Sequence, residues 1–265
     1  QVTDLPLDDT GGMQPTTGDG KGASLEVKNL RYRYPGSDED ALKGVSFQVA
    51  PGERIAITGV GGSGKTSLLE ASMGLLDTWR GGIKFDGSSI RDLNPAALRD
   101  VIGDNLRQED IFAGTVLENL TMGRSDVKWS HLKEAMEATG LDEWVDRLPK
   151  GLQTELDAGG HPLPATLKKR LILARSIAAN TRMIAFDEFF GDLDAGFRTQ
   201  VLELLMDHSR PWTLLVVTRV EEVLRRADRV LVLHDGQIVA SGTFEEVQES
   251  PALQAAVSLS PSSTT

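Results

Sequence analysis

The stretch GVGGSGKTS, at residues 59–67, constrains the fold of this chain more than any other part of the sequence. It follows the apolar, strand-type run RIAIT and opens a run of helical character that begins at Lys65. The pattern G-x-x-x-x-G-K-[ST] between a strand and a helix lets backbone N–H groups wrap a phosphate, which the N-terminus of the helix also faces. A chance Gly-rich turn is the alternative, and the strand–loop–helix context disfavours it. The sequence therefore predicts a phosphate-binding loop.

The loop pattern gives its residues distinct candidate roles. Lys65 is expected to reach the β- and γ-phosphates of a nucleotide, and the Thr66 hydroxyl is expected to hold Mg²⁺. The candidate nucleotide-binding residues of the loop are Gly59, Val60, Gly61, Gly62, Ser63, Gly64, Lys65, Thr66 and Ser67.

A second apolar, strand-type run, RMIAFDEFF, ends in Asp187 and Glu188. A carboxylate at the end of a buried strand can help to hold Mg²⁺, and its neighbour can polarise an attacking water molecule. We therefore predict that Asp187 joins Thr66 as a metal ligand and that Glu188 is the catalytic residue. An Asp-Glu pair at a strand end is by itself more often a solvated turn, but its position downstream of the phosphate-binding loop favours the catalytic interpretation.

The overall charge and the cysteine content exclude several classes of function. The 265 residues carry a formal net charge of −11, whereas nucleic-acid surfaces need clustered Lys and Arg, so no nucleic-acid partner is expected. The absence of cysteine excludes disulfides and Cys-based metal sites. No apolar run approaches the roughly 18–20 residues of a membrane span. The chain begins with Gln and not Met, so we expect it to be part of a longer protein with room for such spans.

Composition divides the chain into three parts. Residues 1–23 are rich in Gly, Thr, Asp and Pro and are predicted to be a flexible linker that follows a transmembrane domain. Residues 246–265 are predicted to be a similar tail with about one turn of helix. Between them, strand-type and helix-type runs alternate over 24–245, which indicates an α/β domain with a largely parallel sheet. Residues from about 96 to 166 are mainly helical and are interpreted as an inserted helical subdomain.

Hydrophobic periodicity and turn residues set the predicted elements. The predicted strands are Leu25–Leu30, Gly44–Val49, Arg54–Thr58, Gly82–Phe85, Arg182–Asp187, Thr213–Thr218 and Arg229–His234. The predicted helices are Lys65–Leu76, Ala96–Val101, Ser130–Thr139, Leu167–Ala179, Ala195–Ser209 and Val220–Arg226.

Beyond these motifs, residues 24–245 resemble the nucleotide-binding domain of ATP-binding cassette (ABC) transporters. The segment RYRYPGSDEDALKGVSFQVAPGERIAITG looks like the opening strands of that domain, with Tyr34 at the position whose ring stacks on adenine. The segment VLVLHDGQIVASGTFEEV looks like its closing strands, and GGIKFDGSSIRDLNPAALRDVIG, IFAGTVLENL and TELDAGG resemble the exporter branch. The resemblance implies a P-loop NTPase (RecA-like) core with an antiparallel β subdomain and an inserted helical subdomain, and it implies ATP and Mg²⁺ as cofactors.

The sequence departs from the family at its signature segment. The family's LSGGQ, which closes on the γ-phosphate held by a partner domain, aligns with LPATL at residues 163–167. Pro164 offers neither a hydroxyl nor an N–H group, and Ala165 and Thr166 place side chains where only hydrogen allows close approach. Thr166 is expected to cap a helix over Leu167–Ala179. A benign family variant is the alternative, which four changes in five positions disfavour.

Two further positions that contact the nucleotide in the family are changed. The family's Gln, which contacts Mg²⁺ and the attacking water, aligns with Arg107, whose guanidinium repels a metal; a one-residue shift of register would put Gln108 there instead. The family's switch His aligns with Arg219, which can hold a γ-phosphate but cannot lose a proton as His does. Glu188 and the Asp194 of GDLD are retained.

Together these features favour the ATP-binding domain of an ABC exporter subunit at the cytoplasmic face of the membrane, with ATP hydrolysis weak or absent. Each lost transition-state contact typically lowers a rate about 10²–10³-fold, whereas binding depends mainly on the intact loop and Tyr34. The expected partners are a second nucleotide-binding domain, identical or not, and the transmembrane domain of the same transporter, so that dimerisation is coupled to transport. Two alternatives stay open: an active transporter ATPase with slow turnover, and a soluble cassette protein without a transport role.

Overall fold

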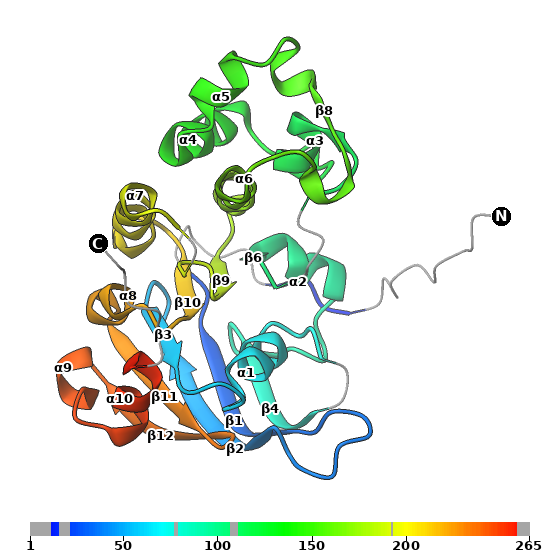
Figure 1. Cartoon of the computed structure of the whole chain (residues 1–265). Coiled ribbons are helices and arrows are strands. Elements are labelled where there is room, and N and C mark those ends of the chain that lie inside the picture. Colours follow the sequence, from blue (N-terminus) through cyan, green and yellow to red (C-terminus); the bar gives the residue numbers. More distant parts are fainter. Residues whose placement is uncertain (1–11, 16–21, 77–78, 107–110, 192, 259–265) are drawn as a thin grey trace.

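The computed structural model describes residues 12–15, 22–76, 79–106, 111–191 and 193–258. In this part of the chain the strands form a six-stranded sheet, a four-stranded sheet and a two-stranded ladder. The two larger sheets lie at one end of the molecule, and the helices between residues 116 and 146 lie at the other (Figure 1). The predicted fold class is confirmed: an α/β P-loop core with an antiparallel β subdomain and an inserted helical subdomain.

The six-stranded sheet forms the P-loop core. In spatial order its strands are β12 (Gln237–Gly242), β11 (Arg229–His234), β3 (Arg54–Thr58), β10 (Thr213–Val217), β9 (Met183–Asp187) and β6 (Ile102–Asp104). Neighbouring strands are parallel, except that β12 is antiparallel to β11. Every residue of β3 and β10 is buried, which explains why these strands read as continuous apolar runs in the sequence.

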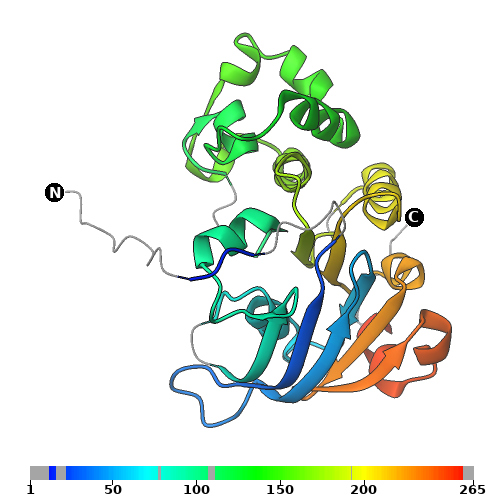
Figure 2. The same cartoon turned by 180° about the vertical axis from the view of Figure 1, so that it is seen from behind.

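The four-stranded sheet is antiparallel throughout. In spatial order its strands are β2 (Leu42–Val49), β1 (Leu25–Tyr32), β4 (Trp79–Phe85) and β5 (Ser88–Ser89). Its buried residues, such as Leu25 and Val27, belong to the same hydrophobic cluster as Ile57 of β3 and Leu215 of β10. The two sheets therefore share one core, and Figure 2 shows them side by side from behind.

The helices follow the predicted order. They are α1 (Lys65–Ser72), α2 (Pro95–Val101), α3 (Val116–Thr121), α4 (Trp129–Thr139), α5 (Asp142–Asp146), α6 (Ala165–Ala178), α7 (Ala195–Met206), α8 (Glu221–Arg226), α9 (Phe244–Val247) and α10 (Pro251–Ser258). Shorter elements are the ladder of β7 (Gly114–Thr115) with β8 (Glu155–Leu156) and the 3₁₀ turns Gly151–Gln153 and Ala158–Gly160. Among the described residues, no helix is long and apolar enough to cross a membrane.

Two predicted helices end earlier than expected, for local reasons. The helix α1 ends at Ser72 because Gly74, at φ +73°, adopts the left-handed conformation that terminates helices. The helix α7 ends at Met206 because the side chain of Asp207 accepts a hydrogen bond from the backbone N–H of Ser209, at 2.8 Å, which forms a turn instead of a further helical residue.

Three less regular segments carry structure that the sequence analysis did not specify. The segment 96–166, interpreted as mainly helical, also contributes β6 to the edge of the central sheet, and three residues between a helix and a loop leave no recognisable pattern. The tail 246–265 carries the two-turn helix α10, whose Leu253 and Ala256 are buried. In the predicted linker, Met13 pairs with Leu93 and Ala23 is fully buried, its N–H donating to the carbonyl of Arg182.

A fully buried arginine at the start of β3 links this strand to the end of α7 and to the turn before β10. Arg54, at the start of β3, is 0% exposed. Its guanidinium donates to the backbone carbonyls of Leu205 at 2.9 Å, of Gly52 at 2.8 Å and of Asp207 at 2.8 Å, and also to that of Trp212. This side chain therefore satisfies carbonyl groups at the end of α7 and in the turn that leads to β10.

Replacement of this arginine is predicted to be strongly destabilising. Arg54→Met keeps an apolar stem of similar length but removes the hydrogen bonds from the buried guanidinium to these carbonyls, which costs about 3 kcal/mol of unfolding free energy in total. Urea unfolding followed by circular dichroism measures this difference. The control is Arg147→Met, because the Arg147 side chain is 75% exposed and should change stability by less than about 0.5 kcal/mol. Equal stability of the two variants would contradict the proposed role of Arg54.

Candidate functional site

Three loops leave the same edge of the central sheet next to one another. The parallel register aligns Ile57 of β3 with Val217 of β10, and Val217 with Asp187 of β9. The phosphate-binding loop, Glu188 and Arg219 therefore each follow these aligned residues by one or two positions along the chain. Ligands of open α/β sheets bind at this carboxyl edge.

Glycines shape the phosphate-binding loop between β3 and α1. A Cβ atom on Gly59 would lie 2.2 Å from the carbonyl oxygen of Leu233, and one on Gly64, at φ +96°, would lie 2.6 Å from that of Ala41. Side chains at these two positions would therefore collide with backbone. In contrast, Cβ atoms on Gly61 and Gly62 would meet no atom within 4 Å, so this part of the loop faces open space. The backbone of this part of the loop is therefore accessible to a phosphate.

Lys65 begins the helix that follows the loop. Its Nζ donates a hydrogen bond to the carbonyl of Val60 at 2.9 Å, which folds the side chain over the loop. Burial lowers the pKa of Lys65 from its ordinary value. The negative charge of Glu188 opposes this shift, the positive charge of Arg219 adds to it, and the negative charge of Asp187 opposes it. The structure thus places Lys65 among the charged groups that the sequence predicted for the phosphate end of the site.

The two predicted metal ligands lie in direct contact. The Thr66 hydroxyl donates to Oδ2 of Asp187 at 2.6 Å. The other carboxylate oxygen, Oδ1, is buried and has no hydrogen-bond partner among the described residues. A buried carboxylate oxygen without a donor is costly unless a cation occupies its lone pairs. This pair fits a small, oxygen-preferring cation such as Mg²⁺, which takes one or two protein oxygens and completes its shell from phosphate and water.

Tyr34 contacts Ser67, the last of the residues predicted to bind the nucleotide. Its hydroxyl is 2.8 Å from Oγ of Ser67 on α1, and its ring packs edge-on against Tyr32 with centroids 4.9 Å apart. The side chain is nevertheless 43% exposed. The hydrogen bond and the neighbouring ring fix the position of Tyr34 while its ring stays accessible for stacking. Stacking on adenine stays a prediction.

Glu188 and Arg219 form an ion pair, with Nε of Arg219 3.3 Å from Oε1 of Glu188. Glu188 adopts the left-handed conformation, at φ 48°, which is uncommon for a residue with a side chain. Its backbone N–H donates to the carbonyl of Val217 at 2.9 Å and so ties this turn to β10. The predicted catalytic carboxylate therefore faces a permanent cation, a pairing that sequence reasoning did not identify.

Two further residues at this edge were missed. Asn105, just after β6, holds the backbone of Asp187: its Oδ1 accepts from the Asp187 N–H at 2.8 Å and its Nδ2 donates to the Asp187 carbonyl at 3.2 Å. Recognition of β6 would have placed Asn105 at the carboxyl edge. Glu70 stands four residues after Thr66 on α1, and burial, followed by the charge of Asp187, raises the pKa of its carboxyl. Its helical spacing from Thr66 was the available signal.

The LPATL segment forms the exposed start of α6. Pro164 and Ala165 are exposed, and the helix begins at Ala165 with Pro164 at the cap position and no side-chain cap. The prediction that Thr166 caps this helix is wrong, because a proline at the cap starts the helix two residues earlier and its carbonyl accepts from the N–H of Leu167 at 3.0 Å. No hydroxyl of this segment caps the helix, and the local fold is nevertheless intact.

The basic residues after this segment donate hydrogen bonds to backbone carbonyls. Lys168 donates to the carbonyl of Gly159 at 2.6 Å and Lys169 to that of Phe189 at 2.9 Å. Arg170 donates to the carbonyl of Thr139 and stacks on Phe197, 3.9 Å from its ring centroid. These contacts fasten α6 to its surroundings. The remaining predicted residues, Arg107 and Gln108, lie outside the described residues, so their roles stay predictions.

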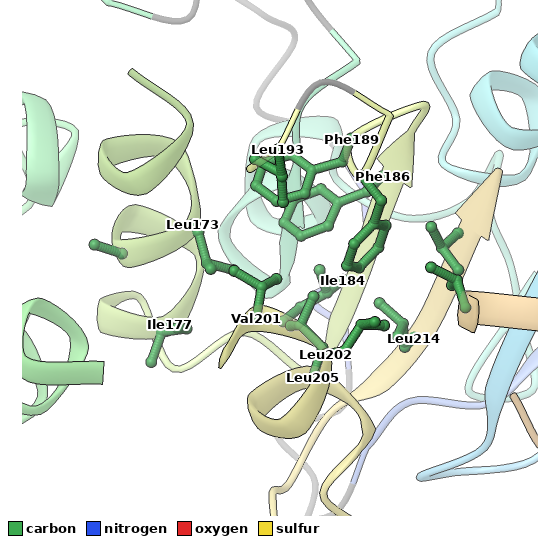
Figure 3. Close-up of a cluster of buried hydrophobic side chains, with 14 of the residues drawn as sticks. Leu173, Ile177, Ile184, Phe186, Phe189, Leu193, Val201, Leu202, Leu205 and Leu214 are labelled. Atoms are coloured by element: carbon green, nitrogen blue, oxygen red, sulfur yellow. The ribbon is translucent and has the colours of Figure 1, made fainter. Parts of the chain in front are cut away.

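A buried apolar cluster includes Phe186 and Phe189, the residues on either side of Asp187 and Glu188. Phe186 and Phe189 stack with centroids 4.5 Å apart, and side chains of α6 and α7, including Leu173 and Val201, pack around them (Figure 3). The retained Asp194 caps α7, its Oδ1 accepting from the N–H of Phe197 at 2.9 Å. The acidic pair is therefore flanked by packed aromatic rings, and Asp194 begins the helix that follows.

Comparisons with known proteins agree with this geometry. The sequence profile of the family described as ABC transporter matches residues 42–191. The glutathione/L-cysteine transport system ATP-binding/permease protein CydC of Escherichia coli is 34% identical over 224 residues, which cover 84% of this chain and 39% of that protein. The ATP-dependent lipid A-core flippase of Aromatoleum aromaticum is 32% identical over 248 residues, 93% of this chain and 41% of that protein.

A solved structure shares the fold. A bacterial Atm1-family ABC exporter with ATP bound superposes with a TM-score of 0.82 at 23% identity, over 95% of this chain and 44% of that one. The chain thus spans well under half the length of these relatives. At this level of identity the likeness shows a shared fold.

The contact between Thr66 and Asp187 predicts that Asp187 raises the affinity for ATP only when Mg²⁺ is present. Asp187→Asn keeps an acceptor for the Thr66 hydroxyl but removes the charge, so it should weaken ATP binding in Mg²⁺ about 10–100-fold and leave binding in EDTA unchanged within about twofold. Calorimetric titration under both conditions measures this. Asp126→Asn serves as the control, because that side chain is 68% exposed, pairs with Arg124 and lies between α3 and α4. Equal weakening with and without the metal would refute the assignment of Asp187 as a metal ligand.

Proposed function

The chain belongs to the ABC transporter family, and we propose that it is the ATP-binding domain of an exporter-type subunit that binds Mg-ATP and hydrolyses it slowly or not at all. The observation that carries this proposal is the contact of Thr66 with Asp187, with an unpartnered carboxylate oxygen, directly beneath an intact phosphate-binding loop. Binding of this kind needs a phosphate-binding loop, its lysine and oxygen ligands for the metal, and the chain contains each of these groups.

Each part of the ATP molecule has a matching group in the chain. The backbone of the loop and Lys65 would hold the β- and γ-phosphates, Thr66 and Asp187 would hold Mg²⁺, and Tyr34 would stack on the adenine. The metal, when bound, neutralises phosphate charge. The chain's own contribution is to fix these groups: Asn105 holds the backbone of Asp187, and Ser67 holds the hydroxyl of Tyr34.

Slow hydrolysis follows from three features of the chain. Glu188 is paired with Arg219 and is therefore less available to accept a proton or orient a water molecule. LPATL presents apolar side chains where the family presents a hydroxyl and glycine N–H groups. Arg107 stands at the position of the family's glutamine. The retained Glu188 favours slow turnover as the second candidate over a complete loss of chemistry.

The proposed setting is the cytoplasmic face of a membrane. We propose that a second nucleotide-binding domain, identical or different, and the transmembrane domain of the same transporter are the partners, and that ATP-dependent dimerisation is coupled to transport. Support comes from the two relatives, an ATP-binding/permease protein and an ATP-dependent flippase, each more than twice as long as this chain, and from the exporter-like segments TELDAGG and IFAGTVLENL.

The first test is calorimetric titration of the 265-residue chain with Mg-ATP. We expect micromolar to sub-millimolar affinity, and we expect Lys65→Ala to weaken it about 10–100-fold, because a charge-assisted hydrogen bond to phosphate is lost. Lys133→Ala, on an exposed side chain of α4, should bind like the unmodified chain. The proposal fails if the unmodified chain gives no binding heat or if Lys65→Ala binds equally well.

The second test restores the family signature in LPATL through Pro164→Ser, Ala165→Gly, Thr166→Gly and Leu167→Gln. In a Glu188→Gln background, which prevents turnover, the repaired chain should form a dimer in ATP, because the segment can then donate hydrogen bonds to the γ-phosphate of its partner. The same background without the repair should stay monomeric while ATP still raises its melting temperature by binding the native state. Sedimentation velocity with and without ATP distinguishes the two species.

The repair experiment also has a clear negative outcome. A stable ATP-dependent dimer of the unrepaired Glu188→Gln chain would mean that LPATL works as a contact surface, and the proposal that its changes weaken the site would be wrong.

A further inference from the structure

A pocket rich in arginine opens on the four-stranded sheet, where the end of β1 lies beside the start of β4. It encloses about 500 Å³, which is within the range of small-molecule sites. Three guanidinium groups and one carboxylate give it a local charge of +2, on a chain whose formal net charge is −11. The residues that line this arginine pocket are Arg31, Tyr32, Arg33, Asp40, Trp79 and Arg80.

A β-bulge in β1 turns two of these arginines to the surface. Up to Val27 the odd-numbered residues of the strand are buried, whereas from Leu30 on the even-numbered residues are buried. The register with both neighbouring strands shifts in this stretch, where Asn29 adopts φ 48°. A bulge adds one residue and so moves every later side chain to the other face of the sheet. Arg31 and Arg33 are exposed as a result.

Like charges face each other across the strands at this point. The register sets Arg31 directly opposite Lys43 of β2 and directly opposite Arg80 of β4. Like charges in this arrangement destabilise a sheet. Lys43 has a close acidic partner, since its Nζ lies 2.5 Å from Oδ1 of Asp235. An anion between Arg31 and Arg80 would remove the repulsion that is left.

The three arginines of the pocket differ in how far their donors are used. Nε of Arg33 donates to Oδ1 of Asp40 at 2.7 Å, whereas Arg31 comes no closer than 3.9 Å to that carboxylate, beyond hydrogen-bond distance. Within the described ranges, Arg80 makes no hydrogen bond or ion pair. The hydrogen bond from Arg33 lowers the pKa of Asp40, and the positive charges of all three arginines lower it further. Arg31 and Arg80 therefore keep free donors beside a carboxylate that is already engaged.

We propose that the arginine pocket binds a small organic molecule through a phosphate monoester group, which Arg31 and Arg80 hold between them. A phosphate monoester carries a charge of about −1.5 to −2 at neutral pH, which matches the charge of the pocket, whereas a carboxylate would neutralise only half of it. Its three terminal oxygens can accept paired hydrogen bonds from two planar guanidinium groups at once. This inference does not depend on the proposed function, because none of these residues is among those proposed to bind ATP.

Buried aromatic residues hold the strands that carry the two arginines. Tyr32, which follows Arg31, and Trp79, which precedes Arg80, are both buried and lie opposite each other in the register. The guanidinium of Arg91 stacks on the Trp79 ring, 3.8 Å from its centroid. The backbone of the pocket is thus fixed before a ligand arrives, so binding has to order only the exposed side chains.

The test is calorimetric titration of the 265-residue chain with glycerol 3-phosphate at low ionic strength. This probe carries a phosphate monoester but no ring that could stack on Tyr34. We expect saturable binding, which Arg31→Gln and Arg80→Gln should each weaken about tenfold, because each removes charge-assisted hydrogen bonds. The matched control is Arg147→Gln, which removes a 75% exposed arginine of α5 and should bind the probe like the unmodified chain.

Further measurements exclude trivial causes of a loss. Thermal unfolding of each variant shows whether the chain is intact; if Arg31→Gln does not fold, Arg80→Gln decides the question, because its side chain supports no described contact. Lys65→Ala should leave the affinity for glycerol 3-phosphate within about twofold of the unmodified chain, since the residue removed belongs to the other phosphate site.

Vesicles that contain phosphatidic acid present the same glycerol phosphate group on a lipid. If the chain binds these vesicles but not the soluble probe, the pocket is not a small-molecule site and the proposal is overturned. Binding of the soluble probe with the expected loss in both arginine variants supports the proposal.

The remaining outcomes separate this proposal from the proposed function. No binding of glycerol 3-phosphate at millimolar concentration, an equal affinity in the Arg31 and Arg80 variants, an equal loss in Arg147→Gln, or a loss only in Lys65→Ala would each overturn the arginine pocket. None of these results bears on Mg-ATP, whose affinity Arg80→Gln should change by less than about twofold. A chain that binds glycerol 3-phosphate as expected but not Mg-ATP would retain the arginine pocket and lose the proposed function.

Discussion

The site depends on the parallel register of β3, β10 and β9. This register sets Ile57, Val217 and Asp187 at one level, so the phosphate-binding loop, the acidic turn and Arg219 meet at a single edge of the sheet. Burial of these strands on both faces fixes the register, since a shifted pairing would displace apolar side chains from both cores. The hydrogen bond from Thr66 to Asp187 joins the loop to the acidic turn and depends on this alignment.

At this edge of the sheet, the groups for binding and the groups for hydrolysis differ in how well they match the family pattern. The groups that we propose for phosphate and metal binding are retained and have supporting contacts: Asn105 holds the backbone of Asp187, and Phe186 and Phe189, on either side of the acidic pair, stack on each other. The groups that would assist hydrolysis are altered, because Glu188 faces Arg219 and LPATL presents Pro164 and Ala165 at the surface. Binding and turnover use different atoms of one site, so a chain can keep the first while it loses the second.

Sequence reasoning succeeded where structure is encoded locally. The phosphate-binding loop was predictable because its glycines allow backbone conformations and close approaches that other residues do not. It failed where a contact depends on register or on very short elements. The Glu188–Arg219 pair joins residues that only the β9–β10 pairing brings together. Asn105 was missed because β6 is three residues long, and the start of α6 was misplaced because Pro164 occupies the cap position.

The most direct test of the central claim, that bound ATP is hydrolysed slowly or not at all, is a single-turnover measurement. The chain is mixed in excess with γ-labelled ATP and Mg²⁺, quenched in acid at successive times, and the released phosphate is counted. We predict that most of the label remains as ATP for minutes, several decades slower than a typical enzyme turnover of roughly 10 s⁻¹. Release of the label at about that typical rate, abolished by Glu188→Gln, would contradict the account.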